Sequence, residues 1–131
     1  MGLKIYAGRT LCLPIPSRQS PHLFIALTGS FSYQDSSIVL VNLTKLGSGR
    51  SKDTTAILQP GDHPFIRVAT VVNYQDAFIA TAANMLQLVT TGKANFMDDC
   101  ESELLDRIQT GALHSPFIDP EIKDMVSDYL N

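Results

Sequence analysis

The sequence predicts an α+β fold, mainly β, in which a small barrel comes first and helices follow. Short apolar runs recur about every ten residues over the first 80 positions, with loops rich in Gly, Pro and Ser between them. This spacing favours a barrel over alternating strand–helix units. After residue 80 the apolar residues recur at helical spacing instead. The 131 residues suit a single domain, with a barrel core over about 8–80 and a helical extension over about 81–131.

The composition is that of a globular protein, with 44% hydrophobic and 18% charged residues. The net charge of −3 argues against a broad nucleic-acid-binding surface, but it leaves room for a local cationic groove. Basic residues are frequent in the first half, whereas residues 96–131 are rich in acids. The charge pattern therefore predicts a mildly basic barrel joined to an acidic, helical tail.

Six apolar runs account for the predicted strands. They span residues 11–15, 22–28, 37–44, 54–58, 68–72 and 77–80. The second run is almost continuously apolar, so we expect it to be buried on both faces, and the third is rich in β-branched side chains. Pro14 confines the first strand to a sheet edge or ends it.

Three helices are expected after the strands. Thr81 can cap the first helix, which Gly92 ends. The acid-x-x-Glu pattern of residues 98–101 predicts the start of the second. Asp119 followed by Pro120 predicts the start of the third. The apolar stripe of this third helix consists of Ile122, Met125, Val126, Tyr129 and Leu130. It either packs on the barrel or serves a partner or dimer interface.

Nothing in the sequence indicates a membrane, a cofactor or a metal site. Cys12 and Cys100 are far apart and show no ligand spacing, so a reduced, cytoplasmic chain is the simpler interpretation. The first residues lack the apolar stretch of a signal peptide, and no run approaches the roughly 20 apolar residues of a membrane span. We therefore expect a cytoplasmic protein with no membrane association.

The loop of residues 59–66 carries the first candidate site. It reads Gln-Pro-Gly-Asp-His-Pro-Phe-Ile, so two prolines and a glycine stiffen the backbone around Asp62 and His63. Rigid loops that carry polar groups are common places for binding or chemistry. The alternative is an ordinary turn, in which Asp62 accepts hydrogen bonds from nearby backbone amides and His63 caps a strand.

Three stretches together resemble the PemK/MazF-type growth-inhibitor toxins. They are His-Leu-Phe-Ile-Ala-Leu-Thr at 22–28, Val-Leu-Val-Asn-Leu-Thr at 39–44 and Gly-Asp-His-Pro-Phe-Ile at 61–66. The sequence is most similar to a divergent branch that carries the Gly-Asp-His-Pro-Phe-Ile signature. The resemblance extends over about residues 8–80, and it depends on the order and spacing of the three motifs.

This resemblance implies an SH3-like barrel with added helices, usually as a homodimer. It also implies the toxin of a type II toxin–antitoxin system, a metal-independent endoribonuclease that cleaves single-stranded RNA and is inhibited by an antitoxin protein. The family's threonine matches Thr44, and its acidic general base matches Asp62. The arginine and glutamine of the family's Arg-x-Asp-Gln-Pro turn are replaced by Pro60 and His63. Its Arg-Pro pair is replaced by Pro21 and His22. The loss of these arginines favours an alternative, a catalytically silent barrel that binds nucleic acid or a protein partner.

Metal-free RNA cleavage needs a base, an acid and groups that stabilise charge on phosphorus. Asp62 or His63 is the candidate base and His22 the candidate acid, while Thr44 can donate a hydrogen bond to a phosphate oxygen. The predicted RNA-binding residues are Arg67, Lys45, Arg50 and Lys52. Three of these residues have an ordinary alternative: His22 begins a strand, Thr44 closes a turn, and Arg67 points to solvent from the other face of a strand.

Overall fold

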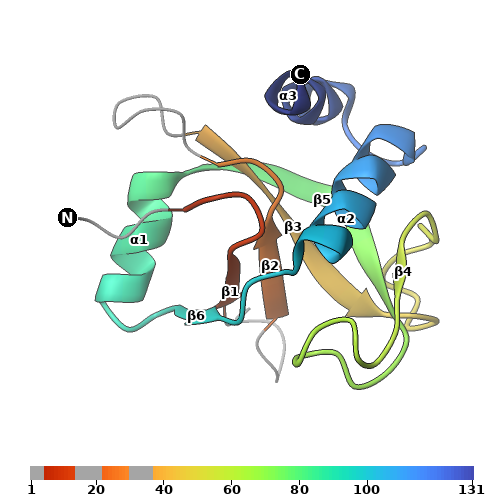
Figure 1. The fold of residues 1–131 in the computed structure, drawn as a ribbon, viewed down its shortest axis with the longest axis horizontal. Coiled ribbons are helices and arrows are strands. Elements are labelled where there is room, and N and C mark those ends of the chain that lie inside the picture. The colour runs from red at the N-terminus through yellow and green to blue at the C-terminus, as the bar shows by residue number, and fades with distance from the viewer. Residues whose placement is uncertain (1–4, 14–21, 30–36) are drawn as a thin grey trace.

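The computed structural model describes residues 5–13, 22–29 and 37–131, and Pro14 and Pro21 lie outside them. These residues form a curled, antiparallel sheet that makes half a barrel, together with three helices (Figure 1). The elements are β1 (Thr10–Leu13), β2 (His22–Ala26), β3 (Ser37–Lys45), β4 (Ile57–Leu58), β5 (Thr70–Thr81), α1 (Ala82–Thr90), β6 (Asn95–Met97), α2 (Ser102–His114) and α3 (Pro120–Leu130). The prediction of an α+β fold, mainly β, is confirmed at this level.

The sheet has the strand order β4-β5-β3-β2-β1-β6, and β3 lies between its two hydrophobic cores. Val39, Val41 and Leu43 face the larger core, while Ile38 and Leu40 face the smaller one. Successive side chains of a strand point to opposite faces, so a strand buried on both sides is continuously apolar. This arrangement explains the long run of β-branched residues. Of the predicted run 22–28, residues 23–28 are likewise buried, whereas His22 at its start is half-buried.

The predicted strands at 68–72 and 77–80 belong to one strand, β5. It pairs with β3 along its length, but the register shifts, because Leu40 pairs with Phe78 whereas Asn42 pairs with Asn73. The extra β5 residues make a bulge, inside which the Asn73 side-chain amide donates to Asp76 at 2.8 Å. Polar residues in the bulge interrupt the apolar pattern, and two runs were therefore predicted where one strand exists.

Two other strand predictions need correction. The run at 54–58 forms a strand only at Ile57–Leu58. Before it, the Asp53 carboxylate accepts from the Thr55 backbone N–H at 2.9 Å, which makes a turn instead of a ladder bond. The short edge strand Asn95–Met97 was not predicted at all. Its three residues are too few and too exposed to show the alternating hydrophobic pattern of a strand. The strand is defined by its pairing with β1.

Two of the helix starts are confirmed and one is not. The Thr81 hydroxyl accepts from the Asn84 N–H at 3.1 Å, and the Asp119 carboxylate accepts from the Glu121 N–H at 2.8 Å. The second helix begins at Ser102 rather than near residue 98, and Glu101 makes no side-chain capping hydrogen bond. The Asp98 carbonyl instead accepts two side-chain donors from elsewhere in the fold.

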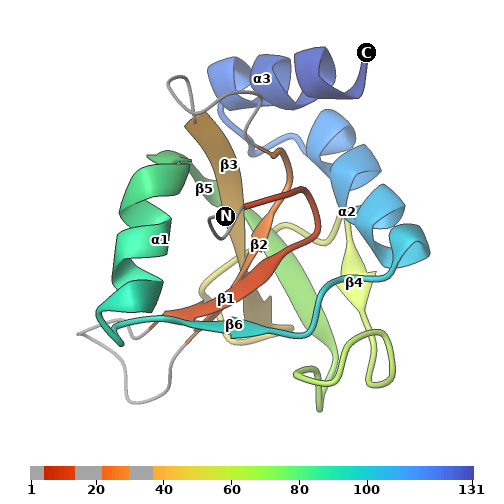
Figure 2. The same cartoon turned by 60° about the vertical axis from the view of Figure 1, so that its left-hand side comes forward.

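The helices cover the two faces of the sheet. Figure 2 shows α1 on one side and α2 with α3 on the other. Residues of α1 complete the smaller core, while α2 and α3 contribute to the larger one. Ile122 and Val126 of the α3 stripe are buried, so the stripe packs on the sheet, and Leu130 at its end stays exposed. Among the described helices, none has the length and hydrophobicity that crossing a membrane requires.

Candidate functional site

A groove of about 460 Å³ lies where the start of β2, the end of β3 and the loop before β5 meet. Five of the eight predicted site residues line it, namely His22, Thr44, Lys45, Arg50 and Arg67. The remaining lining comes mainly from apolar side chains, which include the exposed Phe65 and Val68. The fold thus gathers cations, a hydroxyl and an imidazole that lie up to 45 positions apart in the chain.

The turn after β3 places two of the groove's cations, Lys45 and Arg50. The Ser48 N–H donates to the Lys45 carbonyl at 3.2 Å, which closes the turn. The Ser48 hydroxyl accepts from the Arg50 N–H at 3.3 Å and lies 3.4 Å from the Thr44 hydroxyl. Lys45 and Arg50 are exposed, whereas Thr44 is buried at the cavity wall. Thr44 therefore helps to hold the turn, as its ordinary interpretation states, and also faces the groove.

His22 begins β2 and lies beside Thr44. The register pairs Phe24 with Asn42, and His22 and Thr44 both line the groove just beyond this pair. The His22 Nδ1 atom lies 3.3 Å from the Leu43 carbonyl oxygen. Because a carbonyl only accepts, this contact favours a proton on Nδ1.

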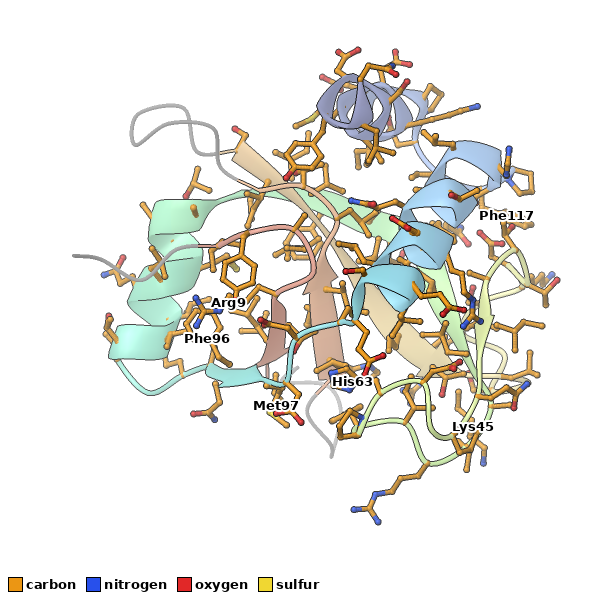
Figure 3. All side chains as sticks on the ribbon, in the orientation of Figure 1. Arg9, Lys45, His63, Phe96, Met97 and Phe117 are labelled. Atoms are coloured by element: carbon orange, nitrogen blue, oxygen red, sulfur yellow. The ribbon has the colours of Figure 1, made fainter. Side chains whose placement is uncertain are left out.

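His63 is only 4% exposed, and both of its ring nitrogens are used within the protein. Nδ1 accepts from the Phe65 backbone N–H at 3.0 Å, so Nε2 carries the proton and donates to the Asp98 carbonyl at 2.5 Å. The Thr10 hydroxyl donates to the same carbonyl at 2.7 Å. His63 therefore connects the 59–66 loop to β1 and to the segment before α2, and Figure 3 shows its ring near Met97 of β6.

Asp62 has the contacts of a turn residue. Its carboxylate accepts from the Gln59 N–H at 2.8 Å, and its own N–H donates to the Gln59 carbonyl at 3.0 Å. Gly61 supplies the positive φ of +102° that this turn needs. Arg107 of α2 lies 3.4 Å from the carboxylate, in a partly exposed ion pair.

The structure therefore separates two sets of predicted residues. Asp62 and His63 line another cavity, of about 400 Å³, together with the acidic residues Asp98, Asp99 and Glu101. They are not among the residues that line the groove of His22 and Thr44. Lys52 is exposed and is also outside the groove lining. Within the described ranges, no three His, Cys, Asp or Glu side chains are grouped so that they could hold a metal ion.

Sequence reasoning did not identify Phe65 as a site residue. Its ring is 37% exposed and lines both the groove and an adjoining cavity of about 790 Å³. Arg67 also lines both. A large aromatic residue after Pro64 in a polar loop was the available signal, but the adjoining cavity depends on β6, which the sequence did not reveal.

Comparison with protein-family models, with curated proteins and with solved structures finds no match to this chain. The resemblance to growth-inhibitor toxins thus depends on the three motifs. Each of these contributes to the groove: His22 from the first, Thr44 from the second and Phe65 from the third. Motifs that are distant in sequence meet at one surface.

Proposed function

We propose that this chain is a PemK/MazF-like toxin of a type II toxin–antitoxin system, and that its groove binds single-stranded RNA and cleaves it without a metal. The observation that carries the proposal is the assembly of His22, Thr44 and three cations in one groove from three separate segments. The curled antiparallel sheet is compatible with an SH3-like barrel. The proposal includes a homodimer in the cytoplasm and an antitoxin partner that covers the groove.

The charges around the groove favour a phosphate backbone as its ligand. Lys45, Arg50 and Arg67 line it, and none of the described residues that line it is acidic. The chain as a whole carries a net charge of −3, so this local excess of cations is distinctive. Guanidinium groups bind phosphate through paired N–H donors, and an open cationic groove can follow a flexible single strand.

Cleavage in this groove would depend on His22. Its imidazole can transfer a proton, Thr44 can donate to a phosphate oxygen, and Arg67 can stabilise the negative charge that develops on phosphorus. Asp62 and His63 would first have to give up their hydrogen bonds within the loop. In this mechanism they hold the loop that presents Phe65 and Arg67, and they transfer no proton.

A specific observation favours a second candidate, a catalytically silent barrel that binds nucleic acid or a protein partner. Of the four predicted catalytic residues, only His22 and Thr44 line the groove, and His22 alone can exchange a proton near neutral pH. General acid–base cleavage usually employs two proton-transfer groups. A groove with one such group can bind RNA and leave it intact.

A cleavage and binding assay tests the proposal. The purified protein is incubated with labelled single-stranded RNA in EDTA, beside His22→Gln, Arg67→Ala and the control Lys52→Ala. We expect the wild type to cleave, and His22→Gln to lower the rate by roughly 10²–10⁴-fold with little change in binding. Arg67→Ala should weaken both binding and cleavage, whereas Lys52→Ala should change neither strongly, because Lys52 lies outside the groove lining.

The same assay distinguishes the two candidates. RNA binding that requires Arg67, without cleavage, would replace the nuclease with the silent barrel. Protein that neither binds nor cleaves RNA, and whose induced expression does not slow growth, would overturn both nucleic-acid proposals.

A further inference from the structure

We propose that the cavity between residues 63–67 and β6 holds one nucleobase of the bound RNA, stacked on the ring of Phe65. This inference depends on the proposed function, because it requires a single strand in the neighbouring groove. The cavity measures about 790 Å³. Its size lies within the roughly 300–1,000 Å³ typical of sites for small organic groups.

Four of the seven described residues that line this cavity are apolar, and large hydrophobic side chains among them are exposed. Phe65 is 37% and Met97 is 39% exposed, although both are large hydrophobic side chains. Phe96 and Pro64 complete the apolar lining. The guanidinium carbon of Arg9 lies 3.4 Å from the centre of the Phe96 ring, which leaves Phe65 as the ring available for stacking. Figure 3 shows Arg9 against Phe96, with Met97 nearer to His63. A planar base would cover this exposed apolar surface.

Phe65 is held in place before any ligand binds. Its backbone N–H donates to the buried His63 ring, which is itself hydrogen-bonded to the Asp98 carbonyl. The next peptide is held as well, because the Ile66 N–H donates to the His63 carbonyl at 2.9 Å. A backbone that is already held at Phe65 loses little further conformational entropy on binding, which favours stacking on its ring.

The distribution of charge shows which part of a nucleotide each cavity can take. The groove is lined by cations, whereas Asp98 lies at the edge of the second cavity. Arg67 belongs to both linings and so stands at the boundary. A phosphate would be attracted to the groove and repelled from the acidic edge, while an uncharged base would suit the apolar cavity. A strand that crosses from one cavity to the other would bind through its phosphate and its base together.

The test combines protein variants with RNA that lacks single bases. Short fluorescent RNAs, one intact and others with one abasic position each, are titrated with wild type, Phe65→Ala and the control Phe117→Ala. Phe117 has a similar exposure, 43%, but lies between α2 and α3. In the wild type we expect one position where loss of the base weakens binding by roughly 5- to 150-fold. This penalty should disappear in Phe65→Ala and persist in Phe117→Ala.

Several outcomes would overturn the inference. Equal binding of all abasic RNAs by the wild type would exclude a base site, while the groove could still bind phosphate. In a second outcome, Phe65→Ala lowers the affinity for every RNA, abasic or intact, by the same factor relative to wild type, so that the abasic penalty persists. This result would give Phe65 a purely structural role or reserve the cavity for a protein side chain. Absence of all RNA binding by the wild type would refute this inference together with the proposed function. Phe65→Leu, which keeps the apolar volume without a ring, replaces Phe65→Ala if thermal unfolding shows the latter to be unfolded.

Discussion

At the scale of single residues, His63 shows how contacts decide chemistry. The sequence places an imidazole beside a carboxylate on a stiff loop, which is typical of a general base. In the structure its two nitrogens face one donor and one acceptor of the backbone. In that position Nδ1 accepts and Nε2 donates, and the buried ring connects two segments of the chain.

We expect His63→Ala to destabilise the protein by at least about 1–3 kcal/mol, because it leaves the buried ring's backbone partners without their hydrogen bonds. Urea unfolding measures the change. His114→Ala is the matched control, since His114 is exposed at the end of α2. If His63→Ala leaves the stability unchanged but abolishes RNA cleavage, His63 does not act by holding the loop. It would then be the general base that the sequence suggested.

At the scale of the elements, one glycine allows α2 to approach the sheet. The Tyr74 hydroxyl of β5 donates to the Ile108 carbonyl of α2 at 2.7 Å, so the ring passes close to the helix. A Cβ atom on Gly111 would overlap the Tyr74 hydroxyl oxygen and lie 3.0 Å from its Cζ atom. Tyr74 is completely buried and has little room to move.

Gly111→Ala is therefore expected to lower the free energy of unfolding by about 1–3 kcal/mol, although alanine by itself favours a helix by about 1 kcal/mol. Thermal or urea unfolding measures the effect. Thr110→Ala, at an exposed neighbouring position, is the control and should be nearly neutral. Tyr74→Phe should reduce the cost of Gly111→Ala, since it removes the overlapping oxygen. A stabilised Gly111→Ala variant would show that the helix can move away from Tyr74.

At the scale of the whole molecule, burial at the sheet–helix interface makes stability sensitive to alkaline pH. Burial raises the pKa of Tyr74, with a further contribution from the Asp53 carboxylate. Burial, followed by the nearby Asp99 charge, raises the pKa of Cys100 from 9.0 to about 12. For both groups the folded state binds the proton more tightly than the unfolded state does. Their stabilising contribution is complete below the unfolded pKa values and decreases as pH rises toward the folded ones.

We therefore expect the free energy of unfolding to decrease from about pH 9 upward, as unfolded thiols and then unfolded phenols ionise. Urea titrations between pH 7 and 11 measure this decrease. Cys100→Ala should remove the part of the pH dependence that begins at about pH 9. Tyr74→Phe should remove the part that begins near about pH 10. The pH dependence of each variant is measured relative to that variant's own, lower stability at pH 7. A stability that stays constant up to pH 11 would contradict the burial of these two groups.

The sequence by itself determined the elements whose signals are local. The apolar runs at 22–28 and 37–44 predict buried strands because side-chain burial on both faces requires continuous apolar residues. Thr81 and Asp119 predict helix starts because their side chains satisfy backbone N–H groups within three residues. Of the eight predicted site residues, five line one groove, because they flank these same strands or the Pro-bracketed loop.

Only the tertiary structure decided what depends on contacts between distant segments. β6 forms because its backbone pairs with the edge strand β1. β5 is one strand because β3 pairs with it on both sides of a bulge. The Nε2 atom of His63 is occupied because the fold brings the Asp98 carbonyl to a ring 35 positions away. The sequence determines which groups are present, but their proton-transfer capacity depends on hydrogen bonds that form only when the chain has folded.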